Sequence, residues 1–479
     1  MLKLSIKIIS FCFLILISFK LIEKYFIKEN RYNYTYHKFN KLTNELEYDL
    51  LFFGSSKSYC GYNPAVFKHN LNLNAYNLAG QGQVLEITEF VIEEALKKTK
   101  PKLIVVDVAY SMVTFEENDS LVNKRKSFQL PVLDNYGLSI NKVEHILKVY
   151  KNEESFYALS PLIRNHDKWS HTVNQNYKRS FLEDKRNLVL SNNGYIGTLQ
   201  YLGPEGNLVA EKMNIGYQTL RNKSEFRVSE KEINVFKKIR DLSKKYNTQV
   251  LFVSTPAIKD YIYRLSYYEN LEKVFNNLEL DYLNLYKHFD KIGIVPENDF
   301  KEIQHLNYNG GYKTSQFLSK YIEKNYNLTP NKSFFKNKLD NNITYHLLTS
   351  LKSTNKLIDK PFKFNDLITA DEIGYFKEDS GTYSFILKLQ KNIDIEKIGD
   401  KYVFYVRYFN GEINNSNKVV KAFPFKVIDV NGNKYIFSRL AIDNIELSKL
   451  DLFFLKRKKT NESRNILTFK HLNLNSNKL

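Results

Sequence analysis

Tyr48-Asp-Leu-Leu-Phe-Phe-Gly-Ser-Ser-Lys-Ser-Tyr-Cys-Gly61 is the stretch that decides the fold of this 479-residue chain. Its apolar run, residues 50–53, is typical of a buried parallel strand, and the glycine and two serines that follow predict a turn. In an open α/β sheet, ligands bind at the carboxyl ends of the strands, so a serine placed there faces a crevice. The stretch therefore predicts a strand that ends in a hydroxyl group.

A serine hydroxyl becomes a good nucleophile only when a neighbouring base takes its proton. The candidate base is His305, far along the chain in Glu302-Ile-Gln-His-Leu-Asn307 and just before an amphipathic segment. We expect His305 to lie in a loop at the start of a helix. Glu302 is the acid expected to hold the imidazole, and Asp299 is the alternative acid.

These residues resemble the SGNH (GDSL-like) hydrolases. That family carries a Gly-x-Ser block after the first strand, an early glycine and an asparagine as oxyanion donors, and a late Asp-x-x-His. The matching blocks are Gly54-Ser55-Ser56, Gly80 in Asn77-Leu-Ala-Gly80, and Glu302-x-x-His305, within roughly residues 48–328. After the third predicted strand, Asp107-Val-Ala-Tyr-Ser-Met112 departs from the family's pattern because it has no Gly-x-Asn-Asp.

The resemblance implies roles for four residues. Ser56 would be the nucleophile, His305 the base and Glu302 its partner, while the backbone N–H groups of Ser56 and Gly80 would form the oxyanion hole. Each role has a structural alternative. The two serines could only cap a helix, Gly80 could be a turn glycine with a positive φ, and His305 could be satisfied at a helix N-terminus.

The order of apolar and amphipathic segments predicts an α/β fold with a doubly wound parallel five-stranded sheet in the SGNH-like, flavodoxin-like order. The expected strands are residues 50–53, 75–78, 103–108, 249–254 and 280–285. Helices are expected at 83–98, at 260–278 and after Ser229-Glu-Lys-Glu232, which has the form of a capping box. A dinucleotide-binding loop at Gly80-Gln81-Gly82 is excluded because Leu85 occupies the third small position.

Four further regions surround this sheet. Residues 1–30, with early lysines and an apolar run at 8–19, predict a signal anchor or transmembrane segment, with a cleaved signal as the alternative. The hydrolase-like domain is expected at 31–330, with a helical insertion at about 111–228. A polar linker is expected at 331–360 and an antiparallel, β-sandwich-like domain at 361–479, where Asn-Gly pairs at 410–411 and 431–432 predict hairpins.

The insertion contains the only tryptophan, in Ser160-Pro-Leu-Ile-Arg-Asn-His-Asp-Lys-Trp169. Arg164 and Trp169 together suit the binding of a sugar or an anionic group. Turn signals at Asn193-Gly194 and Gly203-Pro-Glu-Gly206 predict that the insertion forms a substrate-facing lid. The alternative is that this cluster only caps the end of a helix.

The net charge and the cysteine count limit the classes of ligand that the chain is expected to bind. Lysine and arginine exceed aspartate and glutamate by 71 − 52 = 19, but the basic residues form no stripe interleaved with aromatics, which excludes nucleic acid. Only Cys12 and Cys60 occur, so neither a disulfide framework nor a metal cluster is expected, and no cofactor is predicted.

The sequence therefore predicts a single-pass membrane protein with an extracytoplasmic serine esterase or O-acyltransferase domain. Its expected substrate is a small acyl group, with acetyl as the expected group, on a cell-surface or exported polysaccharide. The layout is also similar to that of the D-alanyl transfer protein of teichoic-acid modification, which implies transfer as well as hydrolysis and a membrane acyl-donor protein as partner. A non-catalytic glycan-binding or polysaccharide-assembly protein that keeps the fold is the alternative.

Overall fold

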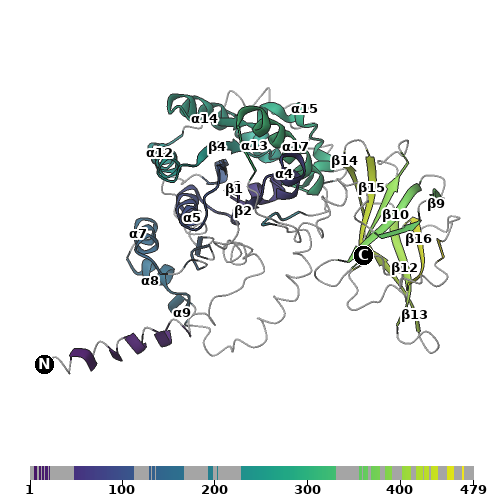
Figure 1. Cartoon of the computed structure of the whole chain (residues 1–479), viewed down its shortest axis with the longest axis horizontal. Coiled ribbons are helices and arrows are strands. Elements are labelled where there is room, and N and C mark those ends of the chain that lie inside the picture. Colours follow the sequence, from purple (N-terminus) through teal and green to yellow (C-terminus); the bar gives the residue numbers. More distant parts are fainter. Residues whose placement is uncertain are drawn as a thin grey trace.

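In the computed structural model of the chain, residues 48–112 and 228–330 are described continuously. Parts of 129–166, residues 193–197, helical residues between 5 and 21, and strands between 355 and 468 are also described. Figure 1 shows the α/β domain and the C-terminal sheets as separate bodies.

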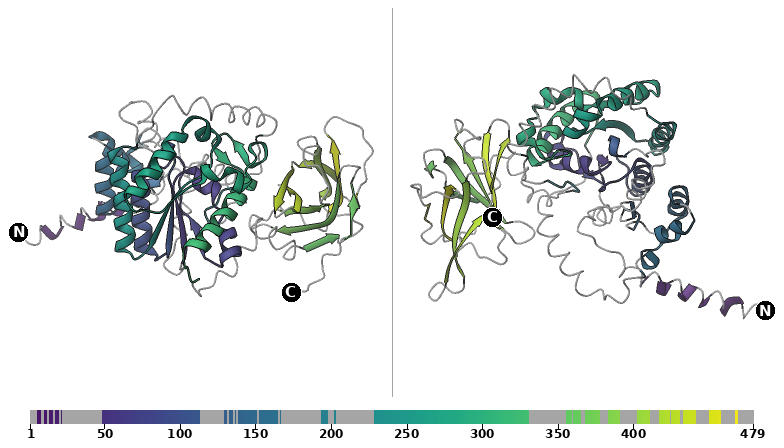
Figure 2. Two further views of the ribbon diagram at one scale, coloured as in Figure 1. Left: turned by 90° about the horizontal axis from the view of Figure 1, so that it is seen from above. Right: turned by 180° about the vertical axis from the view of Figure 1, so that it is seen from behind.

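The α/β domain is organised on a five-stranded parallel sheet with the order β2-β1-β3-β4-β5, which confirms the predicted fold class. This is the flavodoxin-like order, with its switch point between β1 and β3. The strands are β1 (Leu50–Phe53), β2 (Ala75–Asn77), β3 (Leu103–Asp107), β4 (Gln249–Ser254) and β5 (Tyr282–Asn284). Figure 2 shows helices on both faces of this sheet.

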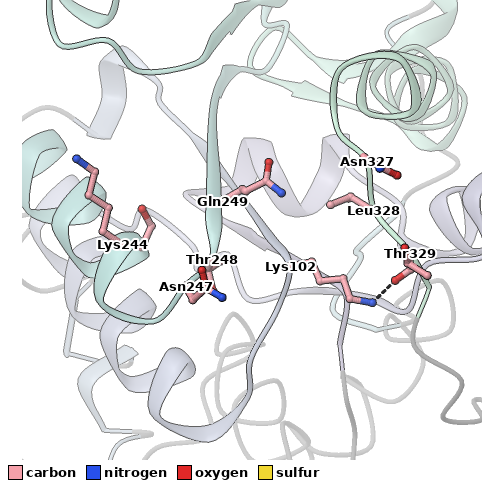
Figure 3. A pocket seen from close by; sticks show the side chains of 9 residues that line it. Lys102, Lys244, Asn247, Thr248, Gln249, Asn327, Leu328 and Thr329 are labelled. Carbon is pink, nitrogen blue, oxygen red and sulfur yellow. Dashed lines mark hydrogen bonds between the residues drawn. The ribbon is translucent and has the colours of Figure 1, made fainter.

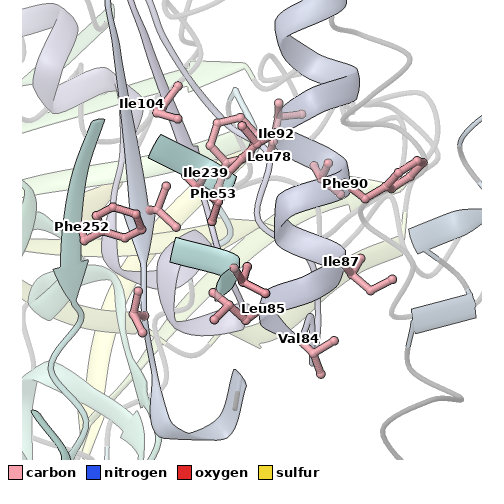
Figure 4. Close-up of a cluster of buried hydrophobic side chains, with 14 of the residues drawn as sticks. Phe53, Leu78, Val84, Leu85, Ile87, Phe90, Ile92, Ile104, Ile239 and Phe252 are labelled. Carbon is pink, nitrogen blue, oxygen red and sulfur yellow. The ribbon is translucent and has the colours of Figure 1, made fainter. Parts of the chain in front are cut away.

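Alternate side chains of each strand enter two different cores, which explains why β1 is apolar throughout. Leu51 and Phe53 pack with α5 (Leu85–Lys98) and α12 (Glu230–Lys245), as Figure 4 shows for part of this cluster. Leu50 and Phe52 face α4 (Pro64–Leu71) and α17 (Tyr308–Asn325) on the other side. The central strand is thus held from both faces, and its carboxyl end is fixed in place.

The predicted helix at 260–278 is instead two helices, α13 (Ile258–Tyr263) and α14 (Leu265–Asn277). The chain leaves the helical conformation at Arg264, whose φ and ψ are −142° and 19°. The predicted capping box is confirmed, because the Ser229 side chain accepts from the Glu232 N–H while the Glu232 carboxylate accepts from the Ser229 N–H.

The described part of the predicted insertion contains short helices. They are η1 (Tyr110–Met112), α7 (Ile140–Val149), α8 (Glu153–Leu159) and α9 (Pro161–Arg164). Between β5 and α17 lie η4 (Leu285–His288), α15 (Phe289–Ile292), α16 (Pro296–Asp299), β6 (Phe300–Glu302) and β7 (His305–Leu306). After β1, the chain turns at Gly54 and continues into α3 (Ser56–Gly61).

The C-terminal strands are antiparallel and form two sheets, as predicted for this region. One sheet contains β14 (Phe425–Val430), β15 (Asn433–Leu440), β11 (Tyr383–Leu389), β10 (Thr369–Lys377) and β8 (Asn355–Ile358), with β9 (Phe362–Lys363) paired to β10. The other contains β13 (Asn417–Phe423), β12 (Tyr402–Asn410), β16 (Leu450–Arg457) and β17 (Leu467–Thr468). β8 lies inside the range predicted as linker, because pairing with β10 orders a segment whose own pattern is too short to predict a strand.

Within the described residues, no helix combines the length and the apolar character that a bilayer crossing requires. Much of the predicted anchor at 1–30, including Cys12, lies outside the described residues, as do residues 331–354 of the predicted linker.

Candidate active site

The two serines after β1 have different roles. Ser55 is the N-cap of α3, where its side chain accepts a hydrogen bond from the Lys57 N–H at 3.4 Å. Ser56 is the first residue of the helix, and its Oγ lies 2.6 Å from Nε2 of His305. The capping explanation therefore accounts for Ser55 and leaves the Ser56 hydroxyl to pair with the histidine.

His305 and Glu302 face each other across a two-stranded antiparallel hairpin, β6-β7, rather than in the loop that the sequence predicts. Nδ1 of His305 contacts Oε1 of Glu302, and the other carboxylate oxygen of Glu302 accepts the N–H of Gln304 at 2.9 Å. The hairpin pairing thus fixes both the carboxylate and the ring. The structure brings Ser56, His305 and Glu302 into one chain of hydrogen bonds.

The carboxylate of Glu302 determines which atoms donate in the hydrogen bonds between His305 and Glu302 and between His305 and Ser56. An ionised carboxylate only accepts, so Nδ1 of His305 carries the proton and Nε2 is left as the acceptor for the Ser56 hydroxyl. This is the tautomer that a general base needs.

Charge and burial favour that state. Burial lowers the pKa of His305 below its ordinary value of 6.5, the hydrogen bond to Glu302 opposes this, and Lys301 and Lys57 lower it further. Burial opposes ionisation of Glu302, but the hydrogen bond and charge of His305 outweigh it and hold the pKa of Glu302 below its usual value. At neutral pH the pair is therefore a carboxylate and a neutral imidazole.

Asp299, the alternative acid, serves a structural purpose. Its buried carboxylate accepts hydrogen bonds from Lys313 Nζ at 2.9 Å, Asn309 Nδ2 at 2.5 Å and the Val295 N–H at 2.6 Å. These contacts tie α16 to α17. The structure therefore favours Glu302 over Asp299 as the partner of His305.

Of the two N–H groups expected to form the oxyanion hole, one already has a hydrogen-bond acceptor. The N–H of Gly80 donates to the carbonyl of Gly54 at 3.0 Å, which closes the loop after β2 onto the turn after β1. It is therefore occupied, and the prediction that it points at the oxyanion is not met. The N–H of Ser56 has no partner among the described residues and remains the available donor.

Gly54 is required by the geometry of the turn. Its φ is +132°, and a Cβ there would lie 2.9 Å from Cβ and 3.0 Å from the carbonyl oxygen of Asp107. Asp107 is itself fully buried and accepts from the N–H of Thr255 at 2.8 Å and from its hydroxyl at 2.6 Å. The ends of β1, β3 and β4 are thus locked together next to Ser56.

A buried ion pair lies beside Ser56, and no sequence pattern predicted it. Lys57 pairs with Asp260, and the two side chains are 4% and 2% exposed. Asp260 also accepts from Arg264 at 2.8 Å and from the hydroxyl of Tyr268 at 2.5 Å. Lys57 follows the predicted polar turn, so no local pattern marked it as buried, and its acid lies 203 positions away on α13.

The predicted substrate-binding pair is not brought to this site by any described contact. The Arg164 guanidinium pairs with Asp134 and donates to the Tyr157 carbonyl at 2.9 Å, contacts that fit the structural alternative. Trp169 lies outside the described residues. Cys60 is buried and takes part in no disulfide among the described residues.

A surface depression of about 550 Å³ lies elsewhere, as Figure 3 shows. Lys102 and Gln249, among its lining residues, stand at the amino ends of β3 and β4. Ser56 follows the carboxyl end of the parallel strand β1, so this depression is at the opposite edge of the sheet.

No family model matches the chain, and no curated protein matches it. Solved structures similar to it include a protein of Bacteroides fragilis NCTC 9343 assigned as an acylhydrolase, 11% identical over 60% of this chain and 93% of that chain, with a TM-score of 0.30. An acetyl xylan esterase is 13% identical over 58% and 99% of the two chains, with a TM-score of 0.26. A two-domain esterase active on acetylated mannans is 9% identical over 88% and 92%, with a TM-score of 0.24.

Proposed function

We propose that this chain is a serine hydrolase of acyl esters, with Ser56 as nucleophile, His305 as general base and Glu302 as the acid that orients it. The observation that carries the proposal is the continuous contact from Ser56 Oγ through His305 to Glu302, with 2.6 Å between the hydroxyl and Nε2. Ion-pair or capping roles alone would not require the hydroxyl and the imidazole to meet at the carboxyl end of the central strand.

The reaction follows from these atoms. Nε2 of His305 takes the Ser56 proton as Oγ attacks the acyl carbon, and the Ser56 N–H donates to the developing oxyanion. As the ester C–O bond breaks, His305 gives the proton to the departing alkoxide oxygen, so that an alcohol is released and Ser56 is left acylated. Attack by water completes hydrolysis, and attack by a second hydroxyl would complete transfer, so the same residues serve either outcome.

We further propose that the acyl group is small and sits on a cell-surface or exported polysaccharide, and that residues 1–30 anchor the chain with this domain outside the cytoplasm. Support for these finer points comes from the apolar run at 8–19 and from the sequence resemblance of the Gly-Ser-Ser and Glu-x-x-His blocks.

Labelling with a fluorophosphonate tests the nucleophile. Wild-type full-length chain in detergent should be labelled, and labelling should be lost in Ser56→Ala and fall steeply in His305→Ala. Ser55→Ala is the matched control, because it removes only the cap and should keep the label. Acetate release from acetylated glycans, with and without an acceptor glycan, then separates hydrolysis from transfer. A folded wild type that takes no label would contradict the proposal and favour a glycan-binding protein.

A further inference from the structure

Folding stability alone does not explain the buried ion pair between Lys57 and Asp260. Burying two charges costs several kcal/mol per ion before they attract each other, and apolar replacements of similar size are often equally stable or more so. Lys57 is nevertheless placed at the position directly after Ser56, with 4% of its side chain exposed. Its location beside the nucleophile points to a role in the chemistry.

The Asp260 carboxylate is shared by two cations. One carboxylate oxygen takes the Lys57 ammonium and the Tyr268 hydroxyl, and the other takes the Arg264 guanidinium. Arg264 is itself held against the Tyr110 ring, 4.3 Å from its centroid. Burial raises the pKa of a second buried acid nearby, Asp107, to about 6, so this carboxyl group is also mostly ionised at neutral pH.

The positive charge of Lys57 lowers the pKa of His305. Glu302 and Lys301, both on its own hairpin, and Lys57 on α3 all act on the pKa of His305. Lys57 thus acts on the pKa of His305 from outside the hairpin, in the same direction as burial. A fixed cation there favours the unprotonated imidazole and, during acyl transfer, the negative charge that develops at Ser56.

We propose that Lys57 is a positioning residue for the proposed reaction: its ammonium, fixed by Asp260, supplies a buried positive charge next to Ser56 that keeps His305 in its neutral form. The inference rests on the proposed function and adds an electrostatic element that the Ser56-His305-Glu302 chain does not contain.

Two substitutions test it in opposite directions. Lys57→Met keeps the length of the side chain and removes the charge, so the pH at which His305 titrates should rise by about half a unit or more. Asp260→Asn leaves the ammonium uncompensated, so that pH should fall. The direct readout is NMR of the imidazole of His305 in full-length protein, together with the acid limb of kcat/KM, which reports the same group in the free enzyme.

Lys313→Met is the matched control. It breaks an ion pair with buried Asp299 at 2.9 Å, and the other contact of the Lys313 ammonium is the Gly293 carbonyl rather than His305. We expect Lys57→Met to lower kcat/KM at neutral pH by about tenfold or more, and Lys313→Met to lower thermal stability without moving the titration. A titration in Lys57→Met that matches the wild type, or shifts of the same sign in Lys57→Met and Asp260→Asn, would overturn the inference.

The two proposals fail differently. If the wild type shows no turnover that depends on Ser56, the proposed function is wrong, while the NMR titration still reports whether Lys57 and His305 interact. If the wild type is active and the titration does not move, only the role of Lys57 is wrong.

Discussion

At the scale of single residues, the turn after β1 depends on the absence of a side chain at Gly54. The left-handed φ of +132° bends the chain so that Ser55 can cap α3 and Ser56 can reach His305. Asp107 fills the space that any Cβ would need. One glycine thus sets the direction of the candidate nucleophile.

Gly54→Ala should therefore harm both stability and labelling. The strained backbone and the 2.9 Å approach to Asp107 are expected to cost about 1–3 kcal/mol in the free energy of unfolding, measured by urea denaturation. The fluorophosphonate label on Ser56 should fall more than the loss of folded protein explains. Gly293→Ala is the control, since Gly293 also has a positive φ of +72° but no atom within 4 Å of its Cβ position. Equal loss of label in both variants would contradict the prediction that the turn at Gly54 positions Ser56.

At the scale of elements, the β6-β7 hairpin selects which acid meets His305. The cross-strand pairing of Glu302 with His305 aligns their side chains, while the Asp299 carboxylate is held by α16 and α17. Glutamate has one methylene group more than the aspartate of an Asp-x-x-His block. The hairpin accommodates this longer side chain because it pairs the backbone of Glu302 with that of His305.

Glu302→Gln and Asp299→Asn should separate catalysis from stability. Glu302→Gln removes the charge that orients and supports the imidazole, so kcat/KM should fall about a hundredfold or more with little change in thermal stability. Asp299→Asn should lower thermal stability, because Lys313 loses its partner, and should leave kcat/KM of the folded fraction within about threefold. The reverse pattern in the two variants would make Asp299 the acid.

At the scale of the whole molecule, the α/β domain contains its own two cores. Every residue of both clusters lies between Tyr48 and Leu328. The C-terminal strands pair only with one another among the described strands. The candidate site is likewise built from β1, α3 and the β6-β7 hairpin, so all of its described residues belong to the α/β domain.

A chain shortened to residues 31–330 should therefore fold and keep the Ser56 label. We expect a cooperative thermal transition and labelling per molecule within about twofold of the full-length chain, since no described contact of the site leaves this range. A shortened chain that folds but takes no label would place part of the site in the C-terminal sheets.

The sequence by itself determined the α/β class, the strand at 50–53 and the blocks that contain Ser56 and His305, because these depend on local patterns of apolar residues, glycine and capping groups. Only the tertiary structure decided that Glu302 rather than Asp299 meets His305, that the Gly80 N–H is occupied by Gly54, and that Lys57 is buried against Asp260. These contacts join segments far apart in the chain or depend on which way a strand turns its side chains. No local pattern records them, since the free energy that fixes them comes from packing the sheet and its helices around the site.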